Sequence, residues 1–76
     1  ASDVYKRQVT DCILFPGVRV ARGAQLSRCI VMQDTCIAAD AILRNVIADK
    51  NVRIGPAVTL TGCEALPIVI PKGSEL

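Results

Sequence analysis

The four cysteines are the residues of this 76-residue chain whose type first suggests chemistry, because thiols bind metals, form disulfides and act as nucleophiles. They are Cys12, Cys29, Cys36 and Cys63, and no two of them form a C-x-x-C pair. The chain has no histidine, so it lacks the commonest general base and a common metal ligand. The cysteine spacing and the missing histidine therefore predict no metal site.

The acidic residues give no sign of an acid/base pair. Beyond the first eight residues they are scattered along the chain, at Asp11, Asp34, Asp40, Asp49, Glu64 and Glu75. The chain also lacks a P-loop, a G-x-G-x-x-G turn after a strand and a nucleophile elbow. We therefore predict no catalytic residue in this chain.

The charge and hydropathy patterns argue against two classes of partner. The net charge is only +2, and no basic run carries interleaved aromatic residues, so a nucleic-acid partner is not expected. No apolar run approaches the roughly 18 residues of a membrane span, and the N-terminus has no apolar signal region. We expect a cytoplasmic protein that binds neither nucleic acid nor membrane.

A repeat of seventeen residues organises the apolar side chains from Thr10 onward. The four repeats are residues 10–26, 27–43, 44–60 and 61–76, of which the last is one residue shorter. Each repeat ends in leucine, and a valine or isoleucine stands six positions earlier. These two columns are Leu26, Leu43, Leu60 and Leu76, and Val20, Ile37, Ile54 and Ile70. A third column contains Val18, Thr35, Val52 and Ile68. A fourth contains Cys12, Cys29, Val46 and Cys63. The residues that directly follow this fourth column are Ile13, Ile30, Ile47 and Glu64.

Aliphatic residues that recur every six positions, each with a small residue two places from it, are the hexapeptide signature of a parallel β-helix. Three short strands joined by tight corners make one triangular coil. Three hexapeptides would give eighteen residues per coil, so a period of seventeen means that one corner is a residue shorter. The predicted fold class is therefore all-β, a left-handed parallel β-helix of about four 17-residue coils. A small antiparallel β-sandwich is the alternative, but it needs hairpin signals and gives no reason for a fixed period.

Equivalent residues of successive coils should stack about 4.8 Å apart, the spacing of neighbouring strands. Cys12 and Cys29 would then lie within disulfide range, although without an export signal we expect reduced thiols that pack as small hydrophobic residues. Arg19 and Arg53 would project the same way two coils apart, as an ordinary solvated face or as a shallow anion site. Glu64 occupies a position otherwise held by isoleucine, so we expect an irregular final corner around CEALP.

The first eight residues, ASDVYKRQ, do not share the repeat. They resemble the translated read-through of a sequencing adapter, and a polar linker from a preceding domain is the alternative. We therefore divide the chain into residues 1–8, a non-native or linker segment, and residues 9–76, a β-helix domain. No cap is visible for the two open ends of such a helix, so we expect the domain to be a fragment of a larger chain or assembly.

Four stretches together resemble one family: ILFPGVRV (13–20), IVMQDTCI (30–37), VIADKNVRIG (46–55) and LPIVIPKG (66–73). They are similar to the C-terminal β-helix domain of glucose-1-phosphate adenylyltransferase, also called ADP-glucose pyrophosphorylase, and above all to the bacterial subunits of glycogen synthesis. The resemblance covers residues 9–76. Its most specific part is the Asp-Lys-Asn corner followed by the PIVIPKG ending.

The resemblance implies that an N-terminal nucleotidyltransferase domain of the same chain makes ADP-glucose and pyrophosphate from ATP and glucose 1-phosphate, with Mg²⁺. For the β-helix it implies no cofactor, contacts with that domain and with the other subunits of a homo- or hetero-tetramer, and part of a site for phosphorylated effectors. One residue can be carried over. The basic residue after Ala48 and Asp49, which is Lys50, is expected at the effector phosphate.

The sequence leaves several alternatives open. The parent chain is either a catalytic or a regulatory subunit. The domain is alternatively the β-helix of a hexapeptide-repeat acyltransferase, which usually relies on a histidine, or of another sugar-1-phosphate nucleotidyltransferase. The effector, the sugar nucleotide made and whether Leu76 ends the parent chain do not follow from these residues.

Overall fold

The computed structural model describes residues 8–76, and within them it consists of short parallel strands in three sheets. Sheet A contains β1 (Gln8–Thr10), β4 (Gln25–Ser27), β7 (Ile42–Arg44) and β10 (Thr59–Thr61). Sheet B contains β2 (Ile13–Leu14), β5 (Ile30–Val31), β8 (Val46–Ala48) and β11 (Ile68–Ile70). Sheet C contains β3 (Arg19–Val20), β6 (Cys36–Ile37) and β9 (Arg53–Ile54).

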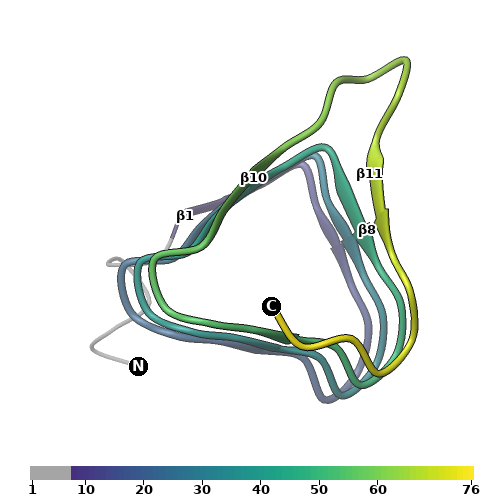
Figure 1. Cartoon of the computed structure of the whole chain (residues 1–76). Helices are drawn as coiled ribbons and strands as arrows, with labels where there is room; N and C mark the ends of the chain where they lie inside the picture. The colour runs from purple at the N-terminus through teal and green to yellow at the C-terminus, as the bar shows by residue number, and fades with distance from the viewer. Residues whose placement is uncertain (1–7) are drawn as a thin grey trace.

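The three sheets form the sides of a triangular solenoid, and the chain visits them in the order A, B, C in each coil (Figure 1). In Figure 1 the chain runs clockwise from β10 through β11 while its coils advance from the far N-terminal end towards the viewer, so the helix is left-handed. The prediction of an all-β parallel β-helix is therefore confirmed. No helix among residues 8–76 is long and apolar enough to cross a membrane.

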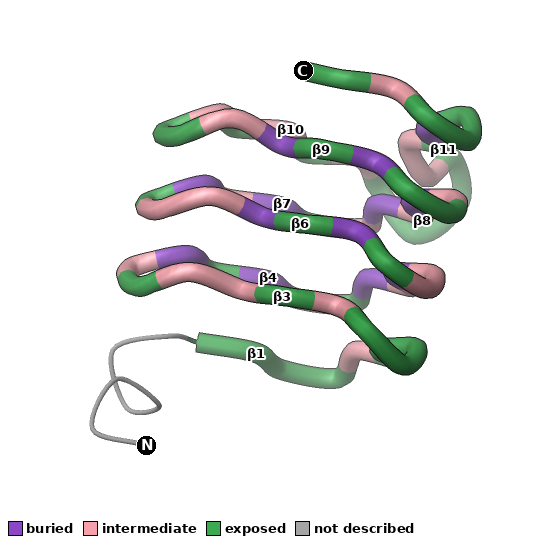
Figure 2. Tube along the Cα trace, turned by 90° about the horizontal axis from the view of Figure 1, so that it is seen from below, coloured by how far each residue is buried: buried purple, intermediate pink, exposed green. Residues whose placement is uncertain are grey.

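The register of the first three coils confirms the seventeen-residue period. Leu26 pairs with Leu43, and Leu60 pairs with Leu43 from the other side. Val20, Ile37 and Ile54 stack in the same way along sheet C. Because successive side chains of a strand point to opposite faces, one residue of each pair in sheet C faces inward and its neighbour faces solvent. The inward residues make a single buried core along the axis (Figure 2). Its fully or nearly fully buried members are Ala24, Leu26, Cys29, Val31, Ile37, Ala41, Leu43, Val46, Ala48, Val52, Ile54 and Ile70.

The tight corners depend on residues in the left-handed backbone region, where φ is positive. One corner column contains Gly17, Asp34, Asn51 and Gly73, with φ between 57° and 80°. A second contains Gly23, Asp40 and Ala57, and a third contains Asp11, Arg28 and Asn45. Glycine, asparagine and aspartate tolerate this region best, which explains why they recur at the corners.

The fourth coil differs from the prediction. Leu60 pairs with Leu43, seventeen residues earlier, whereas Ile68 pairs with Val46, twenty-two residues earlier, so this coil contains five additional residues. They form a loop that projects from the corner between β10 and β11 (Figure 1). The irregular final corner is thus confirmed, but its consequence for the register was not foreseen.

Five predicted column members of the fourth coil are wrong because of this loop, and they include Glu64, since Val69 takes the place beside Ile47. Cys63 lies in the loop, and Ile68 takes the place beside Val46 that spacing gave to Cys63. Ile70 pairs with Ala48 instead of lying beside Ile54. Leu76 is the residue beside Ile54, as the hydrogen bond from Gly55 N–H to Leu76 O (2.7 Å) shows. Ser74 belongs with Val52, because Arg53 N–H donates to Ser74 O at 2.9 Å. The structure thus has three regular turns and one irregular turn.

In the described part of the chain the β-helix begins with Gln8, which pairs with Gln25 and donates its backbone N–H to Ala24 O at 3.0 Å. Gln8, which the sequence placed in the first segment, is thus part of strand β1. The other residues of the segment predicted to be non-native or a linker, 1–7, lie outside the described part of the chain.

Candidate functional site

Lys50 lies at the corner between sheets B and C, in the turn Asp49–Lys50–Asn51. Its backbone N–H donates to the carboxylate of Asp49 at 2.7 Å, and Asn51 N–H donates to Gln33 O on the coil below at 3.1 Å. The buried hydroxyl of Thr35 donates to Asp49 O at 2.8 Å. These bonds hold the turn in place, while the Lys50 side chain is exposed to solvent.

A second lysine lies next to Lys50. Because Ile70 pairs with Ala48 and Gly73 N–H donates to Lys50 O at 3.0 Å, Lys72 occupies the same corner position one coil further on. Adjacent coils are about 4.8 Å apart. Sequence reasoning missed this neighbour, because a seventeen-residue step from Lys50 leads to Pro67. Only the similar outline of the two turns, DKN and PKG, could have indicated it.

The two stacked lysines make a local concentration of positive charge. Two ammonium groups on neighbouring coils repel each other, and an anion between them relieves that repulsion. Lysine acts as a point charge with three donors, which suits a phosphate group. Gln33 lies one coil below Lys50, and its Oε1 is buried without a hydrogen-bond partner among the described residues. The corner can therefore hold an anion on its two lysines, and the buried acceptor of Gln33 contributes nothing to such binding.

The outer face of sheet B is apolar. Ile13, Ile30, Ile47 and Val69 form one outward ladder through all four coils, and their backbones pair directly. Ile13 is 59% exposed and Val69 is 66% exposed, which is unusual for large aliphatic side chains on one face.

The projecting loop borders this face. Arg28 and Glu64 form an ion pair at 3.2 Å, which ties the loop to the second coil, and Asn45 donates its side-chain N–H to Gly62 O at 3.4 Å. A Cβ on Gly62 would lie 2.7 Å from Asn45 O, so glycine lets the chain pass close to the coil below. Between the loop and the ladder lies a hollow of about 320 Å³.

The cysteines have two structural settings. Cys12 and Cys29 stack beside Val46 in the interior, and Cys29 N–H donates to Cys12 Sγ at 3.4 Å. Cys36 and Cys63 are exposed, and all four thiols are free. Burial raises the pKa of Cys29 above the ordinary value of a thiol, and a backbone hydrogen bond at Val46 offsets part of this rise. Cys29 is therefore protonated and unreactive at neutral pH.

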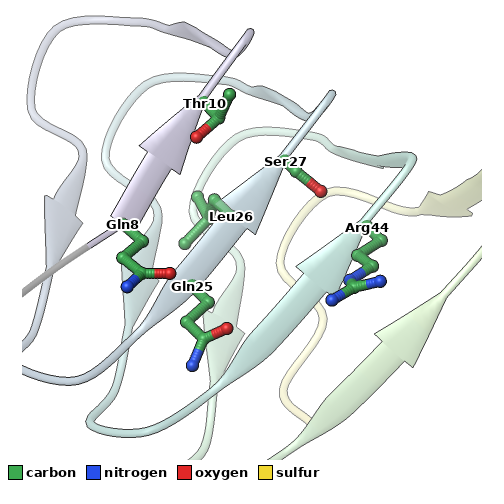
Figure 3. Close-up of a pocket in the computed structure, with 6 residues that line it drawn as sticks. All are labelled: Gln8, Thr10, Gln25, Leu26, Ser27 and Arg44. Atoms are coloured by element: carbon green, nitrogen blue, oxygen red, sulfur yellow. The ribbon is translucent and has the colours of Figure 1, made fainter.

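The predicted acidic and basic residues do not converge on a reaction centre. Residues 8–76 contain no group of three histidine, cysteine, aspartate or glutamate side chains placed to hold a metal. Arg19 and Arg53 do project from one column of sheet C, as predicted, with Cys36 between them. A polar hollow of about 100 Å³ on sheet A is lined by Gln8, Thr10, Gln25, Leu26, Ser27 and Arg44 (Figure 3). It offers neutral amide and hydroxyl groups and a single cation, and we assign no ligand to it.

The fold defines the chain as a hexapeptide-repeat β-helix, with two stacked lysines, Lys50 and Lys72, at one corner and an apolar outer face on sheet B. The family described as GlmU-like, C-terminal hexapeptide matches residues 2–65, and the chain belongs to this family.

Curated relatives narrow the relationship. The chain is 44% identical over 70 residues to the glycogen biosynthesis protein GlgD of Bacillus subtilis (strain 168), a match that covers 92% of this chain and 20% of that protein. It is 34% identical over 56 residues to the glucose-1-phosphate adenylyltransferase of Frankia casuarinae, covering 74% of this chain and 13% of the relative. The corresponding enzyme of a Parafrankia strain is 38% identical over 52 residues, with 68% and 13% covered.

These matches confirm the resemblance to glucose-1-phosphate adenylyltransferase that the sequence indicated. The chain spans a fifth or less of the length of these relatives. No solved structure matches it significantly.

Proposed function

We propose that this chain is the C-terminal assembly and regulatory β-helix of a glucose-1-phosphate adenylyltransferase or of its regulatory subunit in bacterial glycogen synthesis. The parent would convert ATP and glucose 1-phosphate to ADP-glucose and pyrophosphate in the cytoplasm. An upstream nucleotidyltransferase domain would carry the catalytic residues and Mg²⁺. The described part of this chain has no metal-binding cluster for that ion.

The observation that carries the assembly role is the outward ladder of Ile13, Ile30, Ile47 and Val69 on sheet B. Its occupant in this proposal is the upstream domain of the same chain. The longer relatives and the C-terminal position in the family's description support a large upstream partner. A face of this size fits a contact within one chain, because such interfaces bury less surface than obligate dimers.

The spacing of the ladder suits an amphipathic helix of that domain. Its side chains recur about every 4.8 Å along the solenoid axis. Apolar residues of a helix recur on one stripe about every 5.4 Å, once per turn. A helix that lies parallel to the axis would place one aliphatic residue near each of the four coils, with the projecting loop as its lateral wall.

The docking is tested with the upstream domain of the parent protein and this chain as separate polypeptides. Wild-type chain should bind the domain in isothermal titration calorimetry, and replacement of Ile30 and Ile47 by serine should weaken binding at least about tenfold, through the loss of apolar contact. Ile42→Ser is the matched control, because Ile42 is a half-buried outward isoleucine on sheet A. Equal weakening by Ile42→Ser, or none by the sheet B variant, would contradict this docking face.

The regulatory role is proposed for Lys50 and Lys72. A phosphorylated effector would place one phosphate against this pair, and residues of the upstream domain would complete its site. The stacked geometry supports this proposal, since neither lysine forms an ion pair among the described residues. The effector's identity depends on those further residues.

A further inference from the structure

Sheet C presents an outward column of charged and polar side chains that the proposed function does not use. Arg19, Cys36 and Arg53 follow one another on the first three coils, and Glu75 pairs with Arg53 on the fourth. All four side chains are exposed, while their inward neighbours pack towards the core. The charge along this column therefore reads positive, neutral, positive and negative.

A shallow hollow of about 400 Å³ runs beside this column. Its floor contains Ala21 and Ala38, and Gly55 occupies the equivalent position on the third coil. The hydrogen bonds Ala21 N–H to Ile37 O and Ala38 N–H to Ile54 O, both 2.9 Å, show that the backbone here is engaged in the ladder. These small residues let another surface approach closely, and the two arginines supply the cations.

Arg19 and Arg53 form no ion pair within the described part of the chain. They lie two coils apart, about 9.6 Å, with a thiol between them. No free backbone N–H of β6 points between them, because β6 is paired on both sides. The site therefore lacks the convergent donors that would hold a small phosphate.

The column is complementary to itself when the order of its coils is reversed. A two-fold axis parallel to the strands places the first coil of one copy opposite the fourth coil of the other, and the second opposite the third. Arg19 then faces Glu75 of the second copy, and the symmetric pair forms as well. Cys36 faces Arg53 of the second copy, and Ala38 faces Gly55, so small residues meet small residues.

We propose that sheet C is a two-fold interface between two copies of this chain, held by reciprocal Arg19–Glu75 ion pairs over a floor of small residues. This inference goes beyond the proposed function, which uses sheet B and the Lys50 turn, and it names the face of contact between two copies. It leaves sheet B free for the upstream domain, because the two sheets are different sides of the triangle (Figure 1).

Other arrangements of the same two faces are disfavoured by charge. A two-fold axis parallel to the solenoid axis would bring Arg19 near Arg19 and Arg53 near Arg53 of the second copy, and like charges at contact are repulsive. Glu75 also lies beside Arg53 of its own chain in a backbone bridge, and the two side chains form no ion pair there. Asp34 lies at the edge of the face near Arg19. In the proposed arrangement it would face Asn51 of the second copy, which is neutral, so no charge repulsion arises there.

The contact area sets the expected strength. Four coils at about 4.8 Å give a face about 19 Å tall, which is small beside the interfaces of stable dimers. The dimer should therefore be weak and concentration-dependent in the isolated chain, and ionic strength should weaken it further, because the ion pairs lie near its rim.

The test is sedimentation equilibrium of the 76-residue chain at low salt, with circular dichroism to show that every variant keeps its β structure. Wild type should dimerise with rising concentration. Arg19→Glu and Glu75→Arg should each weaken dimerisation about tenfold or more, because each sets like charges against each other. The double variant Arg19→Glu/Glu75→Arg should recover part of the lost dimerisation, because it restores the pair between copies although it places an arginine beside Arg53 of its own chain. Arg44→Glu is the matched control, since Arg44 is an exposed arginine on sheet A.

A second readout reports the geometry. In a Cys63→Ser background, Cys36 of the two copies should be joined by a short flexible bis-maleimide, and the two charge-reversal variants should lose this product. A wild-type chain that stays monomeric at millimolar concentration, or a double variant that fails to recover, overturns the inference. Either result leaves phosphate binding at Lys50 and domain docking on sheet B untouched, so failure of this face is distinguishable from failure of the proposed function.

Discussion

Gly73 donates its backbone N–H to the carbonyl oxygen of Lys50 across 3.0 Å, and this bond places Lys72 directly beside Lys50 on the next coil. The relationship exists because the fourth coil contains a five-residue loop, which moves the PKG turn into the corner column of the DKN turn. The five-residue insertion at the corner between sheets A and B thus determines that Lys50 and Lys72 lie side by side at the corner between sheets B and C. The pair of lysines proposed to bind phosphate therefore comes from two coils together.

Phosphate binding should therefore depend on both lysines. We expect inorganic phosphate to shift the backbone amide signals of Lys50, Asn51 and Gly73 in an NMR titration at low salt. Lys50→Ala or Lys72→Ala should weaken binding about fivefold, and the double variant should abolish it, because each ammonium supplies one charge-assisted contact. Arg44→Ala, on sheet A, should bind like wild type. Unchanged affinity in the double variant would remove the site.

The corner glycines should differ in their tolerance of a side chain. Gly17 and Gly73 share one column with φ of 80° and 76°. A Cβ on Gly17 would collide with the carboxylate of Asp34, whereas a Cβ on Gly73 meets nothing within 4 Å. Gly73→Ala should lower the free energy of unfolding by about 1 kcal/mol, the cost of an alanine in the left-handed region. Gly17→Ala should cost somewhat more, because the exposed carboxylate of Asp34 must turn away and its backbone N lies 3.3 Å from the added Cβ. Urea unfolding measures both values, and equal losses would show that the contact with Asp34 relaxes freely.

The hydroxyl of Thr35 should stabilise the Lys50 turn from within. Thr35 is fully buried, and its Oγ1 donates to Asp49 O at 2.8 Å and accepts from Val52 N–H at 3.3 Å. Thr35→Val keeps the shape but leaves both backbone groups unpaired, so it should lower the free energy of unfolding by about 1–3 kcal/mol. Thr35→Ser keeps both bonds and loses one methyl group, with a cost of about 1 kcal/mol. The prediction fails if denaturant unfolding finds the serine variant less stable than the valine variant.

The buried thiol should make the fold sensitive to alkali. Because burial raises the pKa of Cys29 in the folded state, the unfolded chain loses this proton at a lower pH than the folded chain does. Stability is then unaffected below the ordinary thiol pKa and decreases as the pH rises above it. Cys29→Ala should flatten the alkaline part of a stability–pH curve. A curve that keeps its alkaline slope in the Cys29 variant would contradict this.

The sequence predicts the regular part of this fold well, because each coil repeats the same physical problem. An inward aliphatic residue, a small residue and a left-handed corner residue recur every seventeen positions, so Leu26, Leu43 and Leu60 identify one another. The fourth coil could not be predicted in this way, because its residues fit the pattern in two registers, seventeen or twenty-two residues after the third coil. Cys63 and Ile68 are both small enough and apolar enough for the place beside Val46.

Long-range backbone bonds decide between these registers. Ile68 N–H donates to Asn45 O at 3.0 Å, and Gly62 passes close to the same carbonyl before the chain turns outward. The wrong register of the fourth coil also affects the candidate site. The resemblance indicated Lys50, but a seventeen-residue step from Lys50 leads to Pro67, so Lys72 was missed. The apolar face of sheet B was likewise missed, because an outward isoleucine and an inward one look alike in a repeat.

The central claim is that this β-helix belongs to a nucleotidyltransferase chain and docks on its upstream domain. The most direct measurement is to sequence the coding region upstream of Val9 in the source DNA. The account predicts a glycine-rich nucleotidyltransferase domain upstream of Val9. ASDVYKRQ would then be either absent from the native sequence or retained as a short linker between that domain and Val9. Its catalytic residues would then identify an active or a regulatory subunit. A different kind of domain joined through a genuine ASDVYKRQ segment would contradict the adenylyltransferase assignment and leave only the β-helix.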